Sequence, residues 1–462
     1  MKINSIGLAV AAVSLGALSG CASPSSRRGY SDVSEQVGTR VNASLPSEAD
    51  ARLAVKEKTQ AILKERLTAD GAVQLAFLNN AGLRARLEDI GVAQADMAQS
   101  GILENPNLHF ALRFPNGGGA TQTGREFGVT EDFLSLLSLP LSRRMASAQF
   151  QEAKFRLSHE VLGFAAEVKE AFYSYQAALG RQQARETALE TLTAAAKLLA
   201  GQRGAGNISR LDLIREQAAY EEAKLELTHE RAETAVARER LALLMGVQDM
   251  GDWKVEPEAA ALPAADPPLA GLESEALSRR WDLAAARQEP AVLEQALRVS
   301  RLGAIGGLAI GFDSEKDLDG KFGIGPAVEW KAPIFDRRQA DRARLTARAR
   351  QSEAAIEALS AQVRFEVRSA WTELEAARTA AQSYDQTLIP LRAGIVDESL
   401  KRYNFMLLGV YQLLEAKRDE LAAVRGRIDA MKDYWIAAAR LERAVGGKLS
   451  EGVRLKPQGG KP

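Results

Sequence analysis

The sequence of 462 residues is poor in cysteine, aromatic side chains and net charge. It contains one cysteine, so no disulfide bond can form within the chain. Aromatic residues make up 6% of the sequence, and 60 basic residues are balanced by 60 acidic ones. This balance provides no basic face in bulk, so we expect no nucleic-acid partner. Alanine, glutamate, arginine and leucine dominate instead, a composition typical of long packed helices.

Residues that carry catalysis or hold metals are scarce as well. The three histidines, His109, His159 and His229, have no second ligand at metal-binding spacing, and the methionines are scattered. The glycine-rich stretches 117–119 and 303–307 lack the residues and the helix context of phosphate or dinucleotide loops. We therefore expect no catalytic residues, no metal and no cofactor, and we do not expect an enzyme.

The first part of the chain has an apolar run over residues 6–18 that is too short to span a bilayer as a helix. Residues 1–20 are therefore predicted to be a signal peptide. The stretch Leu18-Ser19-Gly20-Cys21 resembles the lipobox of bacterial lipoproteins, which implies cleavage before Cys21 and lipidation of that cysteine. A plain signal peptide with a chance cysteine is the alternative. The Ala22 that follows implies, by the same resemblance, an anchor in outer-membrane lipid.

Composition divides the rest of the chain. Residues 21–67 are predicted to be a leader, extended and without its own core up to about residue 46, with a short amphipathic helix possible over 50–67. Prolines and alanines mark a linker over residues 256–270. It separates a first repeat, residues 68–255, from a second repeat, residues 271–446. The Gly- and Lys-rich tail, residues 447–462, is predicted to be disordered.

The two repeats share one plan of helix, hairpin and long helical hairpin. The first predicts a helix over 72–99, begun by Asp70, strands over 108–114 and 126–139, and helices over 143–200 and 211–245. Segments of the second repeat follow at an offset of about 200 residues: Leu308 corresponds to Leu108, and Gln412 to Asp212. Arg143-Arg144 is likewise similar to Arg337-Arg338. The chain therefore reads as a tandem duplication.

The second hairpin shows period-two patterning, with strands over 308–312 and 322–330 and a polar turn between them. Small or polar residues occupy one face, and the other face is apolar. Four strands cannot close into a barrel, and open edges do not survive in lipid, so transmembrane strands would require several chains. The residues predicted to face lipid are Ile310, Phe312, Phe322, Ile324, Val328 and Trp330.

The helices that follow the hairpins are very long. One unbroken helix over 143–200 would measure on the order of 90 Å. Apolar residues within these runs recur at the alternating three- and four-residue spacing of coiled coils. A single helix of this length cannot sit in a compact domain, so it must pack lengthwise on similar helices. Two such runs are Val168, Phe172, Tyr175 and Leu179, and Leu421, Val424, Ile428, Met431 and Trp435.

Taken together, the lipobox, the duplication, the hairpin–proline–helix plan and the helical turns resemble the TolC-like outer membrane factor family, from about Asp70 to Gly446. The resemblance implies a mainly α fold with transmembrane β: a homotrimer with a 12-stranded outer-membrane β-barrel, continued by a long α-helical periplasmic barrel. It implies no catalysis. It also implies two partners, a periplasmic adaptor (membrane fusion protein) and an inner-membrane transporter that supplies the substrate.

The turns between the long helices carry the most specific part of this resemblance. In the family an aromatic residue is followed by Gly three residues later and by Asp six residues after that. The first turn keeps Gly206 and Asp212, whereas the second keeps Tyr403 but has Met406 for Gly and Gln412 for Asp. The resemblance implies that both tips contact the adaptor. The residues of the tips are Ala205, Gly206 and Asn207 in the first turn, and Phe405, Met406 and Leu407 in the second.

Two further points stay open at this stage. Phe405 and Leu407 could simply cap the coiled-coil core instead of meeting an adaptor. Gln412 and Glu415 occupy the positions of an acidic periplasmic gate in related proteins, but Glu415 could equally be an exposed helix carboxylate near a turn. The sequence does not indicate which substrate passes through the protein or which class of pump supplies it.

Two other classes of function compete with an outer-membrane channel. A lipidated periplasmic adaptor also contains a coiled-coil hairpin, but it would have a β-rich lipoyl-like half and no duplication. A structural coiled-coil protein of the envelope would lack the alternating segments bounded by proline. The duplicated hairpins therefore favour an outer-membrane channel over both alternatives. The family resemblance implies that such a channel is a passive trimeric conduit in a tripartite efflux or secretion system.

Overall fold

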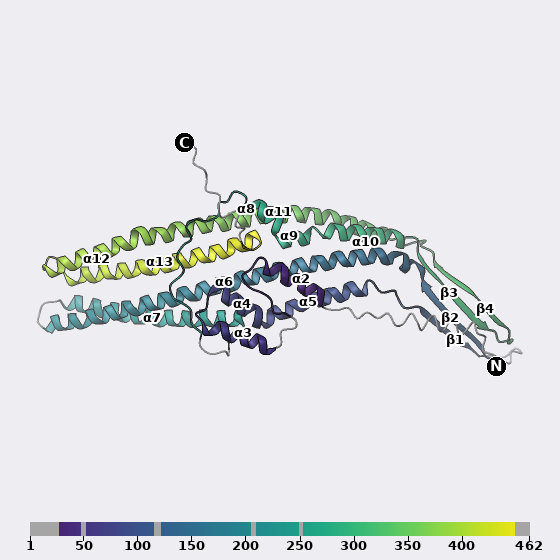
Figure 1. Cartoon of the computed structure of the whole chain (residues 1–462), viewed down its shortest axis with the longest axis horizontal. Helices are drawn as coiled ribbons and strands as arrows, with labels where there is room; N and C mark the ends of the chain where they lie inside the picture. Colours follow the sequence, from purple (N-terminus) through teal and green to yellow (C-terminus); the bar gives the residue numbers. More distant parts are fainter. Residues whose placement is uncertain (1–26, 48–51, 115–121, 205–208, 249–252, 449–462) are drawn as a thin grey trace, which may run out of the picture. The chain divides into compact units, whose positions relative to one another are not determined.

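A computed structural model describes residues 27–47, 52–114, 122–204, 209–248 and 253–448 (Figure 1). The chain forms two compact units. The first, the sheet unit, contains the described parts of residues 1–32, 88–153 and 288–350. The second, the helix unit, contains the described parts of residues 33–87, 154–287 and 351–462. Each unit collects segments from both repeats, so neither repeat folds as a separate domain.

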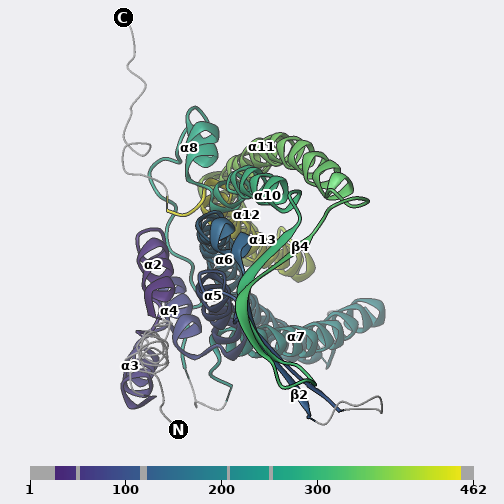
Figure 2. The same cartoon turned by 90° about the vertical axis from the view of Figure 1, so that its right-hand side faces the viewer.

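The sheet unit is built on one antiparallel sheet in the order β1-β2-β3-β4, which forms a single curved layer in Figure 2. Its strands are β1 (Asn107–Arg113), β2 (Gly124–Asp132), β3 (Gly307–Lys316) and β4 (Phe322–Lys331). Neighbouring strands pair over their lengths; Val129, for example, lies opposite Leu108 on one side and Phe312 on the other. Two helices, α5 (Ala81–Gln99) and α10 (Glu289–Gly303), lead toward β1 and β3.

The strand ends differ from the sequence prediction. The second strand was expected to reach residue 139, but it ends at Asp132 and α6 (Phe133–Gly204) begins at once. The carboxylate of Asp132 accepts a hydrogen bond from the backbone N–H of Leu134 at 2.9 Å and so holds the first helical turn. The helix continues through Pro140. In the second hairpin, β3 extends beyond residue 312 to Lys316 because its polar residues still pair with β2 and β4.

The helix predicted over 72–99 is two helices. The first, α4 (Ala69–Asn79), is capped by Thr68, whose hydroxyl accepts a hydrogen bond from Gly71, and it ends where Asn80 adopts an extended backbone with φ −68° and ψ 117°. The same break recurs 200 residues later. Arg280, with φ −64° and ψ 126°, separates α8 (Leu272–Arg279) from α9 (Trp281–Ala286). The two repeats thus share a bend that the apolar pattern does not show.

Long helices make up most of the helix unit. In the first repeat α6 is followed by α7 (Arg210–Met245), and in the second α11 (Gln339–Ser383) leads through a π-helical turn, Tyr384–Leu388, into α12 (Ile389–Asn404). The last helix, α13 (Val410–Val445), lies beside α12 (Figure 1). A continuous core joins α8, α11 and α13. It contains Leu272, Ala276, Val363, Val367, Ala370, Leu374, Tyr434, Ala437, Leu441, Ala444 and Val445.

The leader differs from the prediction in its first part, which was expected to be extended up to about residue 46 but contains α2 (Arg27–Gly38). The short helix considered over residues 50–67 is present as α3 (Arg52–Lys64). Val33 and Val37, one helical turn apart, are fully buried, and Leu45 beyond the helix is buried as well. Apolar residues four apart are what a helix needs to bury one side, and this short signal was outweighed by the polar composition around it.

The segment predicted as a linker, residues 256–270, has no helix, but it is not free. The amide of Gln176 donates to the Glu256 carbonyl at 2.8 Å, and the indoles of Trp371 and Trp435 donate to backbone carbonyls further along the segment. Arg378 holds Asp266 through two hydrogen bonds of 2.5 and 2.6 Å. The segment is therefore a strap that is fixed to the long helices.

Candidate functional site: a two-faced sheet and a helical tip

One face of the sheet is apolar and open to the surroundings. In antiparallel pairs, residues directly opposite share a face, and the register places Ile310 opposite Val328 and Leu308 opposite Trp330. Exposed fractions on this face reach 72% for Ile324. All six residues predicted to face lipid lie on it, and the first repeat adds to it the exposed side chains of Leu108, Phe110, Leu112 and Phe127. A soluble monomer rarely exposes so large a contiguous apolar surface.

The opposite face is polar or small. Arg113 reaches Glu126 on the neighbouring strand at 2.6 Å and Glu315 on β3 at 3.0 Å, so charged groups bridge three strands. On β4 this face carries Gly323, Gly325, Ala327 and Glu329. A Cβ added at Gly325 would meet nothing within 4 Å. This face is suited to water, and the sheet as a whole is suited to separating water from lipid.

The outer edges of the sheet are incomplete. Within the described strands, β1 pairs only with β2 and β4 pairs only with β3. Each outer strand therefore keeps one row of backbone N–H and C=O groups without a partner strand. A bilayer offers no water to satisfy these groups, so the sheet needs further strands on both edges if it lies in lipid.

The second helical tip ends in a complete Schellman motif. The N–H of Leu407 donates to the carbonyl of Arg402 and the N–H of Met406 to that of Tyr403, both at 2.9 Å. Met406 has a φ of 57°, a left-handed conformation that favours glycine. Phe405, Met406 and Leu407 are highly exposed, Met406 at 95%, so in this chain they do not cap a core. The first tip, Ala205–Asn207, lies outside the described residues, as does Cys21.

The two predicted gate residues lie close to this tip. Gln412 and Glu415 are exposed and one turn apart near the start of α13. Two ion pairs follow within the next turn of α13. Arg418 pairs with Glu216 of α7 at 2.6 Å, and Asp419 pairs with Arg392 of α12 at 2.6 Å. These pairs fix the helix that carries Gln412 and Glu415 to both of its neighbours.

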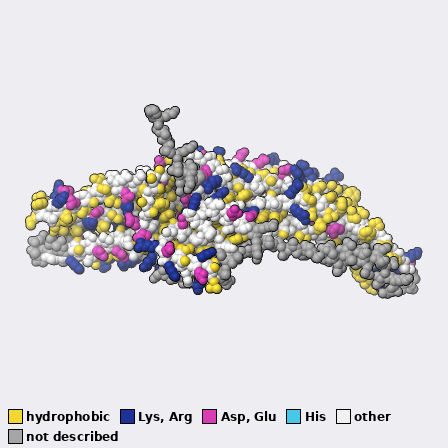
Figure 3. Space-filling model, in the orientation of Figure 1, with side chains coloured by type: hydrophobic (Ala, Val, Ile, Leu, Met, Phe, Trp, Pro, Cys, Tyr) yellow, Lys and Arg dark blue, Asp and Glu magenta, His cyan; other side chains and the backbone are white. Residues whose placement is uncertain are grey.

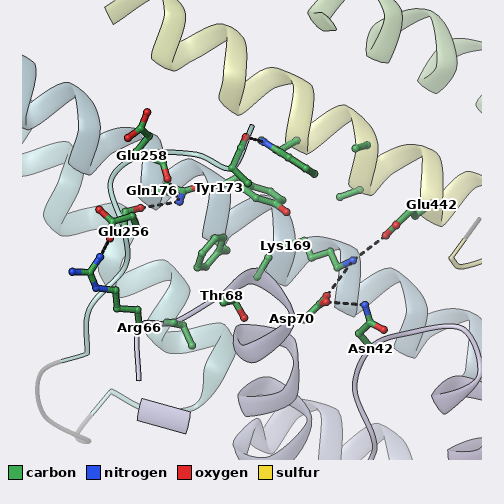
Figure 4. A pocket seen from close by; sticks show the side chains of 17 residues that line it. Asn42, Arg66, Thr68, Asp70, Lys169, Tyr173, Gln176, Glu256, Glu258 and Glu442 are labelled. Carbon is green, nitrogen blue, oxygen red and sulfur yellow. Dashed lines mark hydrogen bonds and ion pairs between the residues drawn. The ribbon is translucent and has the colours of Figure 1, made fainter. Parts of the chain in front are cut away.

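A polar cluster that the sequence analysis missed lies in the helix unit (Figure 4). The ammonium group of Lys169 on α6 lies 2.9 Å from Glu442 of α13 and 3.6 Å from Asp70 of α4. Asn42 of the leader donates to the same Asp70 at 2.7 Å. Burial alone would lower the pKa of Lys169, but Glu442 and Asp70 outweigh it and raise that pKa, so the lysine stays charged.

This cluster borders a cavity of about 500 Å³ that is also lined by Tyr173 and Trp435, whose rings stack. Burial raises the pKa of Tyr173, so its hydroxyl stays neutral. No sequence signal could have found the cluster, because its charges come from positions up to 372 residues apart, Asp70 to Glu442. We assign it a structural role, since it ties the leader, α4, α6 and α13 together.

The described residues contain no group of three or more His, Cys, Asp or Glu side chains arranged to hold a metal ion. The helices in this part of the chain also include none that is long and apolar enough to cross a membrane.

Comparisons with known proteins identify outer membrane proteins that are similar to this chain. No protein-family model matches the chain. The outer membrane protein OprJ of Pseudomonas aeruginosa is 26% identical over 416 residues, which span 83% of this chain and 85% of OprJ.

Solved structures show the fold. The outer membrane protein VceC of Vibrio cholerae matches with a TM-score of 0.63 at 15% identity, covering 82% of this chain and 96% of VceC. The open state of the MtrE outer membrane channel of Neisseria gonorrhoeae also matches with a TM-score of 0.63, at 18% identity, covering 81% of this chain and 88% of MtrE. The present chain has the fold of these outer-membrane proteins over most of its length.

Proposed function

We propose that the chain belongs to the TolC-like outer membrane factor family and is the outer-membrane channel of a tripartite efflux or secretion system, a proposal supported by its 26% identity to OprJ. In this role it is a passive conduit from the periplasm and an inner-membrane pump to the outside of a Gram-negative cell. The observation that carries the proposal is the sheet, whose apolar face and open edges suit a barrel wall and whose ends continue into long helices.

The assembly we propose is a homotrimer. Each chain supplies four strands, and β4 of one chain would pair with β1 of the next. Three chains then close a barrel of 12 strands, an even number within the range of bacterial outer-membrane barrels. Pairing in this way satisfies the two open edges and places the polar face, with Arg113, Glu126 and Glu315, toward the lumen.

The partners we propose are a periplasmic adaptor and an inner-membrane transporter. Phe405, Met406 and Leu407 present three adjacent apolar side chains at the end of a helical hairpin, where only water would otherwise meet them. Such a tip suits contact with the tips of adaptor helices. We propose the same role for Ala205, Gly206 and Asn207 at the other tip, and lipidation at Cys21.

The test is export in cells that lack the native protein. Met406→Asp places a charge in the proposed contact, and Gly206→Trp adds bulk at the other tip. Each variant should reach the outer membrane as a trimer, yet fail to restore export and fail to cross-link to the adaptor. The control is Leu53→Asp, which changes another exposed apolar residue, 73% exposed, on α3 and should export normally.

Two outcomes would count against the proposal. Normal export by Gly206→Trp would overturn contact at the first tip. A wild-type protein that is recovered as a monomer, or outside the outer membrane, would overturn the channel itself.

A further inference from the structure

The connection between β4 and α11 exposes apolar side chains and then basic ones. Ile334 is 70% exposed and Phe335 is 91% exposed, although both are large and apolar. Arg337 and Arg338 follow after Asp336 and are exposed as well. Arg342 lies one turn further, within the first turn of α11. We refer to these five residues as the collar.

The strand register places the collar at one end of the sheet. Asp132, the last residue of β2, pairs with Ala309, which in turn pairs with Glu329 near the end of β4. Both connections to long helices therefore leave from the same end. The first turns of α6, which follow β2 at once, have a similar order, with exposed Leu136 and Leu137 and then Arg143 and Arg144 six residues after Leu137. Figure 3 shows basic side chains at the border of the hydrophobic surface in this part of the sheet unit.

The arginines of the collar have no carboxylate partner among the described residues. The guanidinium of Arg337 donates to the carbonyl of Pro333 at 3.3 Å, and Arg342 donates to the carbonyl of Arg337 at 3.4 Å. Residues 331–350 contain seven basic and two acidic residues, a local net charge of +5 in a chain whose total net charge is zero. In the helix unit, by contrast, arginines such as Arg181 and Arg378 are held by carboxylates.

The stretch holds two carboxylates of its own, but Asp336 accepts from the backbone N–H of Arg338 at 2.7 Å and Asp341 pairs with Arg344, so neither forms an ion pair with an arginine of the collar. Basic side chains near the first turn of a helix oppose the helix dipole, which favours negative charge at that end. The Nε of Arg342 is buried without a hydrogen-bond partner. Arg338 also adopts a left-handed backbone with a φ of 55°, which is strained for any residue other than glycine. An external anion between the guanidinium groups would remove the repulsion and supply the missing acceptor.

We propose that the collar binds the phosphate headgroups of anionic phospholipids. These lipids would lie at the membrane surface where the strands continue into the long helices. The inference rests on the proposed function, because it needs the sheet to lie in a bilayer. Ile334 and Phe335 would enter the acyl region, and the guanidinium groups would hold phosphate with paired hydrogen bonds. Apolar residues followed by basic ones are the order in which a chain leaves a bilayer for its anionic surface. The collar thereby fixes the height of the sheet in the membrane.

The test is titration of the detergent-solubilised full-length trimer with phosphatidylglycerol, followed by native mass spectrometry. The wild type should bind phosphatidylglycerol more tightly than the zwitterionic phosphatidylcholine. Arg337→Gln combined with Arg338→Gln should weaken phosphatidylglycerol binding about 30-fold, because each basic residue near an anionic surface contributes on the order of a fivefold change. The matched control is Arg84→Gln with Arg86→Gln, two exposed arginines of α5, which should leave binding unchanged.

Three outcomes would overturn the inference. Equal binding of phosphatidylglycerol by both double variants would show that the collar does not hold the headgroup. Full displacement of the lipid by an equal concentration of inorganic phosphate would make the collar a site for free anions. Suppression of lipid binding by an acidic peptide at the same concentration would make it a protein contact. None of these three outcomes contradicts the proposed channel function. That function would be contradicted if the wild-type protein formed no trimer in the membrane.

Discussion

Met406 shows at the scale of one residue how a helical tip can retain strain. Its left-handed backbone completes a Schellman motif, yet a side chain at this position costs about 1 kcal/mol relative to glycine. We expect Met406→Gly to stabilise the tip by about that amount, measured as slower hydrogen exchange of the amides around residues 402–407. Met406→Ala, which shortens the side chain without relieving the backbone, is the control. Equal protection of both variants would show that the strain is absent.

A second prediction at the scale of one residue concerns His159, which makes the stability of the folded chain depend on pH. Its imidazole is largely buried on α6, and burial lowers its pKa, although Asp282 at 3.8 Å acts in the opposite direction. The nearby Arg280 and Arg443 also lower that pKa, and Glu366 raises it. Below a pH of about 6.5 the unfolded chain therefore binds a proton before the folded chain does, so stability falls as the pH falls.

His159→Gln should reduce this loss of stability. The measurement is the shift of the thermal unfolding midpoint between pH 7 and pH 5, compared with the wild type. His229→Gln, a change at an exposed histidine, controls for the loss of an imidazole as such. If His159→Gln and the wild type lose the same number of degrees, His159 does not contribute to the acid sensitivity.

At the scale of elements, the sheet predicts a difference between neighbouring residues of one strand. Ile324 lies on the apolar face, and an arginine there should cost about 2–4 kcal/mol near the middle of the bilayer. Gly325 lies on the polar face, and a Cβ there meets nothing within 4 Å, so an arginine should be accommodated. The measurement is the free energy of urea-induced unfolding of the trimer in lipid vesicles. Equal losses for Ile324→Arg and Gly325→Arg would contradict the assignment of the two faces.

The regular elements could be predicted because their signals are local. Alternation specified β1 and β4 closely, and the period of the apolar residues specified α7. Element ends are decided by contacts that a sequence pattern does not contain. Asn80 breaks the predicted helix because its amide donates to the carbonyl of Leu244 at 2.9 Å and its side-chain oxygen caps Leu83 at 2.8 Å. Asparagine is a common helix cap, so a weak local signal was present.

The candidate site was predictable to different degrees. The apolar face of the sheet follows from period-two spacing, so all six of its predicted residues fall on one face. The exposed tip follows only from the family resemblance, since three apolar residues at a turn also fit a capped core. The cluster around Lys169 depends on Asp70 and Glu442, which only the folded chain brings together. No pattern of spacing indicates such a contact.

Attachment to the membrane is a property of the whole molecule and has two proposed sources. One is the acyl anchor at Cys21, and the other is the barrel itself. We expect Cys21→Ser to abolish labelling by radioactive palmitate but to reduce membrane association only in part, because the barrel still inserts. The measurement is the protein that stays with the outer-membrane fraction after a carbonate wash. Labelling of the Cys21→Ser variant at the wild-type level would overturn lipidation at this position.

Whether the channel is open or closed is also a property of the whole assembly. Glu415 can restrict the passage only if three copies of α13 meet at the channel axis. A ring of three carboxylates would favour cations and resist anions in a narrow passage, and Gln412, one turn before Glu415, adds no charge to it. We expect Glu415→Ala to leak small solutes into the periplasm, measured as uptake of an anionic dye. The variant should still cross-link to the adaptor, because Glu415 lies beyond the apolar tip. Unchanged permeability would leave Glu415 as an ordinary exposed helix residue, and the ion pairs of Arg418 and Asp419 would then be the contacts that hold α13 in place.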